Sequence, residues 1–176
     1  MKLATAIAAA TMAIAAPASA ERFVLSNDGY WETALNVEAD TNFAYCSTGN
    51  LNDSMSFRMT VTDSGGYWIF INDFATRDRQ YLETFDMRLL IEGRDPVTWT
   101  MGSAEIEADG NGIVISFSFA NAFESSDFFV DIMLNDSVKL LDIDTDEAVA
   151  GWSLQGSASA IAALKKCGSM ILKGNV

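Results

Sequence analysis

The sequence predicts an all-β domain with a C-terminal helix, built as an antiparallel β-sandwich or a partly closed barrel, with a short additional helix near 125–135. Three observations predict this class. Apolar and polar residues alternate with a period of two, turn-forming residues interrupt the alternation, and an Ala-rich segment with helical spacing lies near the end of the chain. Such alternation is typical of strands with one buried and one wetter face, and short strands at this spacing are typical of sandwiches and barrels.

Residues 1–20 predict an export signal that precedes the folded domain. A positive charge at Lys2 is followed by an apolar run over 3–16, and the segment ends in the Ala-x-Ala pattern that a signal peptidase recognises. The run is shorter than the ~20 apolar residues that a membrane-spanning helix needs. We therefore expect cleavage after Ala20, a single β-rich domain over 21–176, and a periplasmic or secreted location in a bacterium.

Several segments of the expected domain have the pattern of strands. Most alternate between apolar and polar residues, whereas 67–71 is apolar throughout and predicts a strand covered on both faces. Turn residues at 63–66, 93–96 and 109–112 predict hairpins between consecutive strands. The other strand segments are 31–37, 55–61, 87–91, 97–101, 113–119, 138–144 and 149–155.

Two segments have helical spacing instead. Paired apolar residues recur one turn apart within 125–135 and predict the short helix. The clearer helix covers the Ala-rich run 158–166, which follows Ser157 and carries two lysines in its expected last turn, where positive charge complements the helix dipole. Gly168 is the expected residue that ends this helix.

The two cysteines, Cys46 and Cys167, predict one disulfide, because a cysteine pair in an exported protein is normally oxidised. Their spacing does not resemble the Cys-x-x-Cys pattern of redox enzymes, so we expect a structural bridge. Cys167 follows Leu164 by three residues and shares its helical face. The bridge would fasten that face to the strand that carries Cys46.

The composition restricts the chemistry. The chain has no histidine, which removes the usual general base near neutral pH and the His-based zinc sites. A net charge of −13 disfavours binding to nucleic acid and favours a basic protein as partner, with a small ligand as the alternative. We assign no catalytic residue, no metal ligand and no cofactor. We expect a monomer that does not insert into a membrane after signal cleavage.

Two acidic clusters could form a functional site. Asp142, Asp144 and Asp146 match the first positions of a calcium loop, but Glu147 replaces the required glycine and the terminal acid is missing. We interpret them as solvent-facing charges on an edge strand, which discourage edge-to-edge pairing. Glu105 and Glu107 share one strand face and could serve glycoside chemistry, but no second element orients the pair.

The aromatic residues admit two interpretations. They could form a stacking platform for a sugar or a peptide, or they could face the core. Their alternation with polar neighbours favours the core for each of them. The residues concerned are Trp31, Tyr67, Trp68, Trp99 and Trp152.

The end of the chain resembles a known group. Trp152, Leu154 and Gly156 form an aromatic-x-Leu-x-Gly strand that leads into a helix with Leu164 and Cys167. This ending is similar to that of small exported alphaproteobacterial proteins, including those of the invasion-associated locus B type. The resemblance implies an exported β-domain with a docked C-terminal helix and without an assigned activity.

Together these patterns predict an exported cell-envelope protein that acts as a binding or accessory domain rather than an enzyme. Two alternatives remain open. One is an acidic inhibitor of a cationic enzyme, and the other is a hydrolase that uses carboxylates. A hydrolase would need two carboxylates that converge in a concave pocket.

Overall fold

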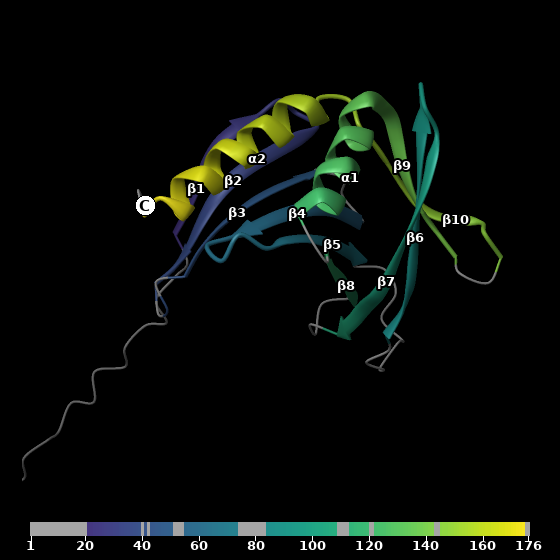
Figure 1. Ribbon diagram of the computed structural model, residues 1–176, viewed down its shortest axis with the longest axis horizontal. Coiled ribbons are helices and arrows are strands. Elements are labelled where there is room, and N and C mark those ends of the chain that lie inside the picture. The colour runs from purple at the N-terminus through teal and green to yellow at the C-terminus, as the bar shows by residue number, and fades with distance from the viewer. Residues whose placement is uncertain are drawn as a thin grey trace, which may run out of the picture.

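The computed structural model shows a long, bent antiparallel sheet with two helices on one side (Figure 1). Its strands are β1 (Glu21–Asn27), β2 (Trp31–Glu38), β3 (Phe43–Asn50), β4 (Met55–Thr62), β5 (Tyr67–Asp73), β6 (Thr84–Gly93), β7 (Val97–Ala108), β8 (Ile113–Ser118), β9 (Asn135–Leu141) and β10 (Ala148–Ser153). The helices are α1 (Ala122–Leu134) and α2 (Ser157–Leu172). The structure describes residues 21–39, 41, 43–50, 55–73, 84–108, 113–119, 122–142 and 145–174.

The strands follow the order β1-β2-β3-β4-β5-β8-β7-β6-β9-β10. The first half is a meander, and the second half joins it where β8 pairs with β5. β1 and β10 form the two edges, so the sheet is not closed into a barrel. The predicted class is thereby confirmed: the fold is antiparallel β with a C-terminal helix, and its two halves face each other in the manner of a sandwich.

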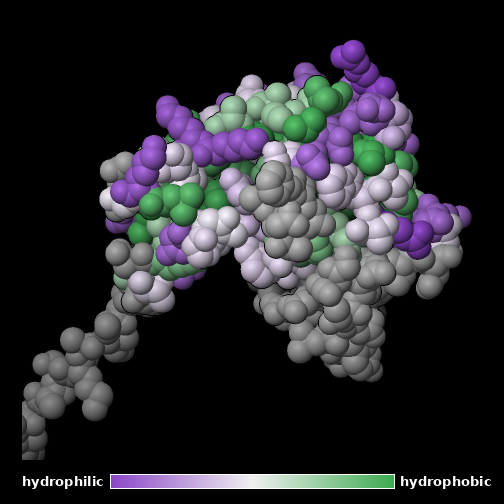
Figure 2. Space-filling model, in the orientation of Figure 1, coloured by the Kyte–Doolittle hydropathy of each residue, from purple (hydrophilic) through white to green (hydrophobic). Residues whose placement is uncertain are grey.

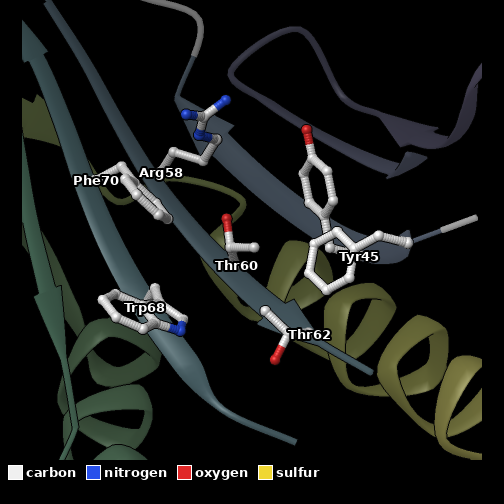
Figure 3. A pocket seen from close by; sticks show the side chains of 7 residues that line it. Tyr45, Arg58, Thr60, Thr62, Trp68 and Phe70 are labelled. Carbon is white, nitrogen blue, oxygen red and sulfur yellow. The ribbon is translucent and has the colours of Figure 1, made fainter. Parts of the chain in front are cut away.

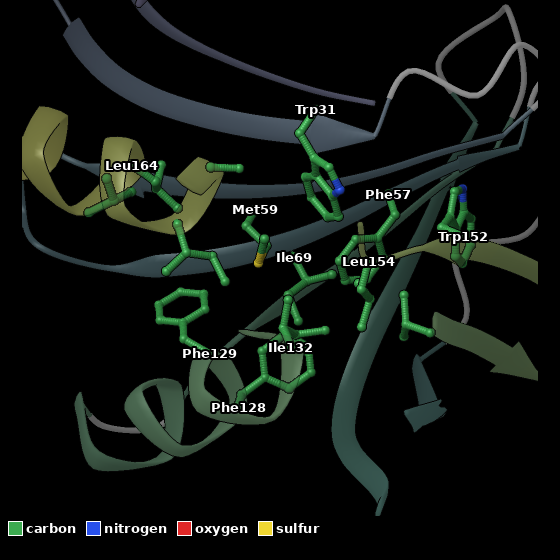
Figure 4. Packing of buried hydrophobic residues seen from close by; sticks show 14 of the residues in the cluster. Trp31, Phe57, Met59, Ile69, Phe128, Phe129, Ile132, Trp152, Leu154 and Leu164 are labelled. Atoms are coloured by element: carbon green, nitrogen blue, oxygen red, sulfur yellow. The ribbon is translucent and has the colours of Figure 1, made fainter. Parts of the chain in front are cut away.

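The two halves of the sheet meet at one end of the core (Figure 4). The rings of Phe57 on β4 and Trp152 on β10 lie 5.4 Å apart between centroids. Beside them, the Asn50 side-chain amide donates a hydrogen bond of 3.0 Å to the carbonyl oxygen of Ser153. These contacts join the two halves of the sheet and stabilise its bend.

The helices fill the concave side of this bend. α2 packs against β2, β3 and β4, while α1 packs against β9, β6 and α2. One continuous apolar cluster lies between helices and sheet, with Met59, Ile69 and Leu164 each fully buried in it. The surface seen in Figure 2 is largely hydrophilic, and apolar patches lie on it near both ends of α2. Among the described residues no helix is long and apolar enough to cross a membrane.

Two strands, β1 and β3, lack the alternation that identified the others. The side chains of β1 are mostly exposed, and its register with β2 shifts between Val24 and Ser26. β3 turns small and polar side chains toward the helices, such as Thr48, whose hydroxyl lies 2.8 Å from that of Thr33. Only the predicted bridge at Cys46 indicated a strand there.

The predicted disulfide is confirmed. Cys46 on β3 and Cys167 on α2 are bonded, with their Cα atoms 5.9 Å apart. Both residues are buried beneath the helix, so the bridge fastens α2 to the middle of the first half of the sheet. The hairpins at 63–66 and 93–96 and the short helix are confirmed as well, whereas the turn at 109–112 lies outside the described residues.

The predicted end of α2 at Gly168 was wrong. The helix continues to Leu172, so Lys165 and Lys166 do not stand in its last turn. Gly168 is buried, and a Cβ atom there would lie 2.9 Å from a methyl carbon of Val61. The glycine therefore permits close packing of helix on sheet, which outweighs its poor helix propensity.

The start of α2 depends on Gly156, which precedes the helix with a φ of 85°. A Cβ atom there would collide with the Asp28 carboxylate, whose Oδ1 accepts hydrogen bonds from the backbone N–H groups of Tyr30 and Trp31. We expect Gly156→Ala to lower the free energy of unfolding by more than the ~1–2 kcal/mol of left-handed strain alone. Gly29→Ala is the matched control, since Gly29 has a φ of 89° and open space around it. Equal losses in urea denaturation would contradict the clash.

Candidate functional site

The face of the sheet opposite the helices carries a concave site on β3, β4 and β5. On β4, Phe57, Met59 and Val61 are buried toward the helices, so the alternate residues Arg58 and Thr60 project from the other face. Aromatic residues of β3 and β5 stand on either side of this row (Figure 3). Together they enclose a hollow of about 360 Å³.

We call this site the aromatic hollow. Its walls are aromatic and its floor is polar, and none of its described residues is acidic. It is lined by Phe43, Tyr45, Arg58, Thr60, Thr62, Trp68 and Phe70.

The two walls are pairs of rings that stand two residues apart on one strand. On β3, the centroids of Phe43 and Tyr45 lie 5.9 Å apart with an angle of 33° between planes. On β5, Trp68 and Phe70 stack at 6.2 Å and 21°. β3 and β5 are two strand spacings apart, about 10 Å. The register places Tyr45 beside Thr62 and Trp68 beside Thr60, so the two walls are offset along the strands, with the threonine hydroxyls between them.

Arg58 brings a positive charge to one end of the aromatic hollow. Its guanidinium carbon lies 5.2 Å from the centre of the Phe70 ring, a cation–π arrangement. Figure 3 shows the Tyr45 hydroxyl directed toward the same end. The buried Arg58 Nε has no hydrogen-bond partner, and no ion pair joins Arg58 to an acid among the described residues.

Burial lowers the pKa of the Arg58 guanidinium, with the Tyr45 phenol opposing that shift and the charge of Arg22 adding to it. The ordinary pKa of a guanidinium lies far above neutral pH, so the group stays charged. A charge that is partly withdrawn from water and has no counter-ion is costly. Arg58 is therefore poised to gain from an anionic partner.

The register explains why Arg58 has no acid beside it. Glu32 on β2, Gly49 on β3 and Arg58 on β4 lie in one row across the strands. The Glu32 carboxylate is engaged elsewhere, since it pairs with Arg22 and accepts a hydrogen bond of 3.1 Å from Asn27. Gly49 between them has no side chain, and a Cβ atom there would lie 3.4 Å from the Arg58 Cβ atom, so this position supplies no acid and the glycine permits close packing of Arg58.

The aromatic residues divide between core and surface. Trp31 and Trp152 are 1% and 3% exposed and lie in the core as predicted, and Tyr67 packs edge-on against Phe129 of α1. The prediction was wrong for Trp68, which is 36% exposed and lines the aromatic hollow. Since 67–71 is apolar throughout, its pattern could not distinguish a second covering layer from an open aromatic face.

The acidic clusters do not form a site among the described residues. Asp142 accepts hydrogen bonds from the backbone and hydroxyl of Thr145, and Asp146 pairs with Arg88. Asp144 lies outside the described residues. No group of three potential metal ligands occurs in the part of the chain that the structure describes.

Glu105 pairs in register with Ser116 of β8, and Glu107 pairs with Val114. Their side chains lie outside the described part of the structure. The structure therefore describes only the backbone of Glu105 and Glu107. Both lie on β7, and no described residue of β7 lines the aromatic hollow.

Comparison with known proteins gives no match to this chain. No family model, no curated protein and no solved structure is similar to it. The resemblance of its ending to small exported alphaproteobacterial proteins stays a prediction, and the aromatic hollow is the feature on which a functional assignment rests.

Proposed function

We propose that the protein is an exported binding domain that holds a small ligand with a flat apolar part in the aromatic hollow. The observation that carries this proposal is the pair of aromatic walls on either side of a floor that includes hydroxyl groups. Aromatic side chains supply large apolar contact with few rotatable bonds, which is the usual basis of small-ligand sites.

The chemistry of the lining favours binding over catalysis. Thr60, Thr62 and Tyr45 offer hydroxyls that can orient a ligand, while no lining residue is a carboxylate. A carboxylate-based hydrolase would need such groups in the concave site. The aromatic hollow therefore supports the binding interpretation over the hydrolase.

An exported location agrees with the disulfide. Cys46 and Cys167 form a bridge that persists in oxidising compartments such as the bacterial periplasm. The signal predicted in 1–20 would deliver the domain there, and its acidic surface would keep it soluble. Small ligands that enter the periplasm would then reach the aromatic hollow directly.

The test is a titration of nitrogen-15-labelled protein with the neutral flat probe 2-naphthol, followed by NMR. We expect shifts of the Trp68 indole N–H and of the Arg58 and Thr60 amides, because these groups line the aromatic hollow. Trp68→Ala should weaken binding by ~3–10-fold through loss of one aromatic wall. Shifts confined to α2, or no shifts, would contradict the proposal.

Tyr30→Ala is the matched control for Trp68→Ala. Tyr30 is also an exposed aromatic residue, 48% accessible, but it lies in the β1–β2 turn and does not line the aromatic hollow. Its removal should leave the affinity for 2-naphthol unchanged. An equal loss in both variants would mean that the probe binds exposed rings without selectivity.

A further inference from the structure

We propose that the natural ligand of the aromatic hollow is an acid, a planar aromatic or conjugated carboxylate whose charged group binds Arg58. This inference rests on the proposed function and adds the chemical class of the ligand. It commits the site to a small anion in a protein whose net charge is −13.

The unpaired charge of Arg58 carries the inference. Its guanidinium lies over the face of Phe70, at 5.2 Å, and no carboxylate among the described residues forms an ion pair with it. In an acidic chain, counter-ions for an arginine are abundant, yet Glu32 in the same row is engaged with Arg22 and Asn27. A ligand carboxylate would supply the missing charge, and arginine binds carboxylates through two parallel hydrogen bonds.

The position of Arg58 fits a ligand with one charged end and one flat end. The guanidinium and the Tyr45 hydroxyl lie at one end of the aromatic hollow, and the flat ring of Trp68 lies farther along β5 (Figure 3). The planar part of the ligand then lies over Thr60 between the two walls.

The second arginine strengthens the preference for an anion. The charge of Arg22 helps to lower the pKa of Arg58, so Arg22 lies near it. Glu32 already pairs with Arg22, which leaves neither of these two groups to neutralise Arg58. A cationic ligand would meet repulsion here although the overall field of the protein would attract it.

The experiment compares 2-naphthoate with 2-naphthamide, which has nearly the same shape without the charge, by calorimetry on the mature protein. We expect 2-naphthoate to bind at least ~10-fold more tightly, since a charge-assisted hydrogen bond forms only with the acid. Its affinity should fall as salt rises, while that of the amide should not. Equal affinities for the two probes would overturn the acid and leave the proposed function standing.

The variant Arg58→Gln separates the roles further. It should weaken 2-naphthoate by ~10-fold or more and 2-naphthamide by a much smaller factor, and the remaining binding of the amide also shows that the variant is folded. Arg58→Lys should restore part of the loss. Arg94→Gln, which changes an exposed arginine in the β6–β7 turn, is the matched control and should alter neither probe.

Each remaining outcome bears on one proposal. If 2-naphthoate binds to Arg58→Gln as tightly as to the unchanged protein, the acid does not use Arg58 and the inference is wrong. If neither probe binds at millimolar concentration, the proposed function fails with it. Cyclohexanecarboxylate, an acid that is not planar, should bind more weakly than 2-naphthoate, and equal binding would overturn the planar class.

Discussion

Leu164→Asp is expected to unfold the domain. Leu164 is fully buried between α2 and the sheet, next to the disulfide. The substitution removes an apolar side chain and places a carboxylate without a partner in the core, at a cost of at least ~5 kcal/mol. Total stabilities of domains are about 5–15 kcal/mol, so most of the protein should be unfolded or should melt far lower. Circular dichroism during a thermal melt measures this.

Ala162→Asp is the control for that prediction. It introduces the same charge into the same helix, two residues earlier, at an exposed position. The expected loss is about 1 kcal/mol or less, mainly from helix propensity. Comparable melting temperatures for the two variants would mean that α2 does not bury its Leu164 face.

Removal of the disulfide is the second large effect. The bridge spans a sequence separation of 121 residues, so it restricts the unfolded chain strongly. In the chain-entropy model, a bridge that closes a loop of this length raises the free energy of unfolding by up to ~5 kcal/mol. The paired variant, a double substitution of Cys46→Ala and Cys167→Ala, should lose a large part of this stabilisation. The urea midpoint of the variant should fall well below that of the oxidised protein.

Chemical reduction is the matching measurement on the unchanged sequence. Denatured protein without reductant should show no free thiol, and after reduction its urea midpoint should approach that of the paired variant. Two reactive thiols before reduction would contradict the bridge. A midpoint that reduction leaves unchanged would show that the packing of α2 alone holds the helix on the sheet.

The framework of the fold could be predicted because strand alternation and helical spacing report directly on burial. The strands with strict alternation, such as 55–61, match β4, and the Ala-rich helix matches most of α2. The order of the strands could not be predicted, because the insertion of β8 beside β5 depends on contacts distant in sequence. The length of α2 was underestimated because Gly168 serves packing against Val61 rather than termination.

The aromatic hollow could not be predicted from the sequence, for a related reason. Alternation separates the two faces of a strand but does not say which face another layer covers. Trp68 and Phe70 are as apolar as their neighbours in β5, so the sequence pattern predicted coverage on both faces. Phe43 and Tyr45 belong to β3, whose inward side chains are small and polar, so its sequence lacks the usual alternation. Only the pairing of β3 with β4 places these two rings beside the aromatic hollow.

The docking of α2 has a consequence for how the chain acquires its structure. β2, β3 and β4 are made first, but the helix that covers their apolar face is the last element of the chain. The core therefore cannot be completed until α2 has been made, and the bond between Cys46 and Cys167 cannot form before then.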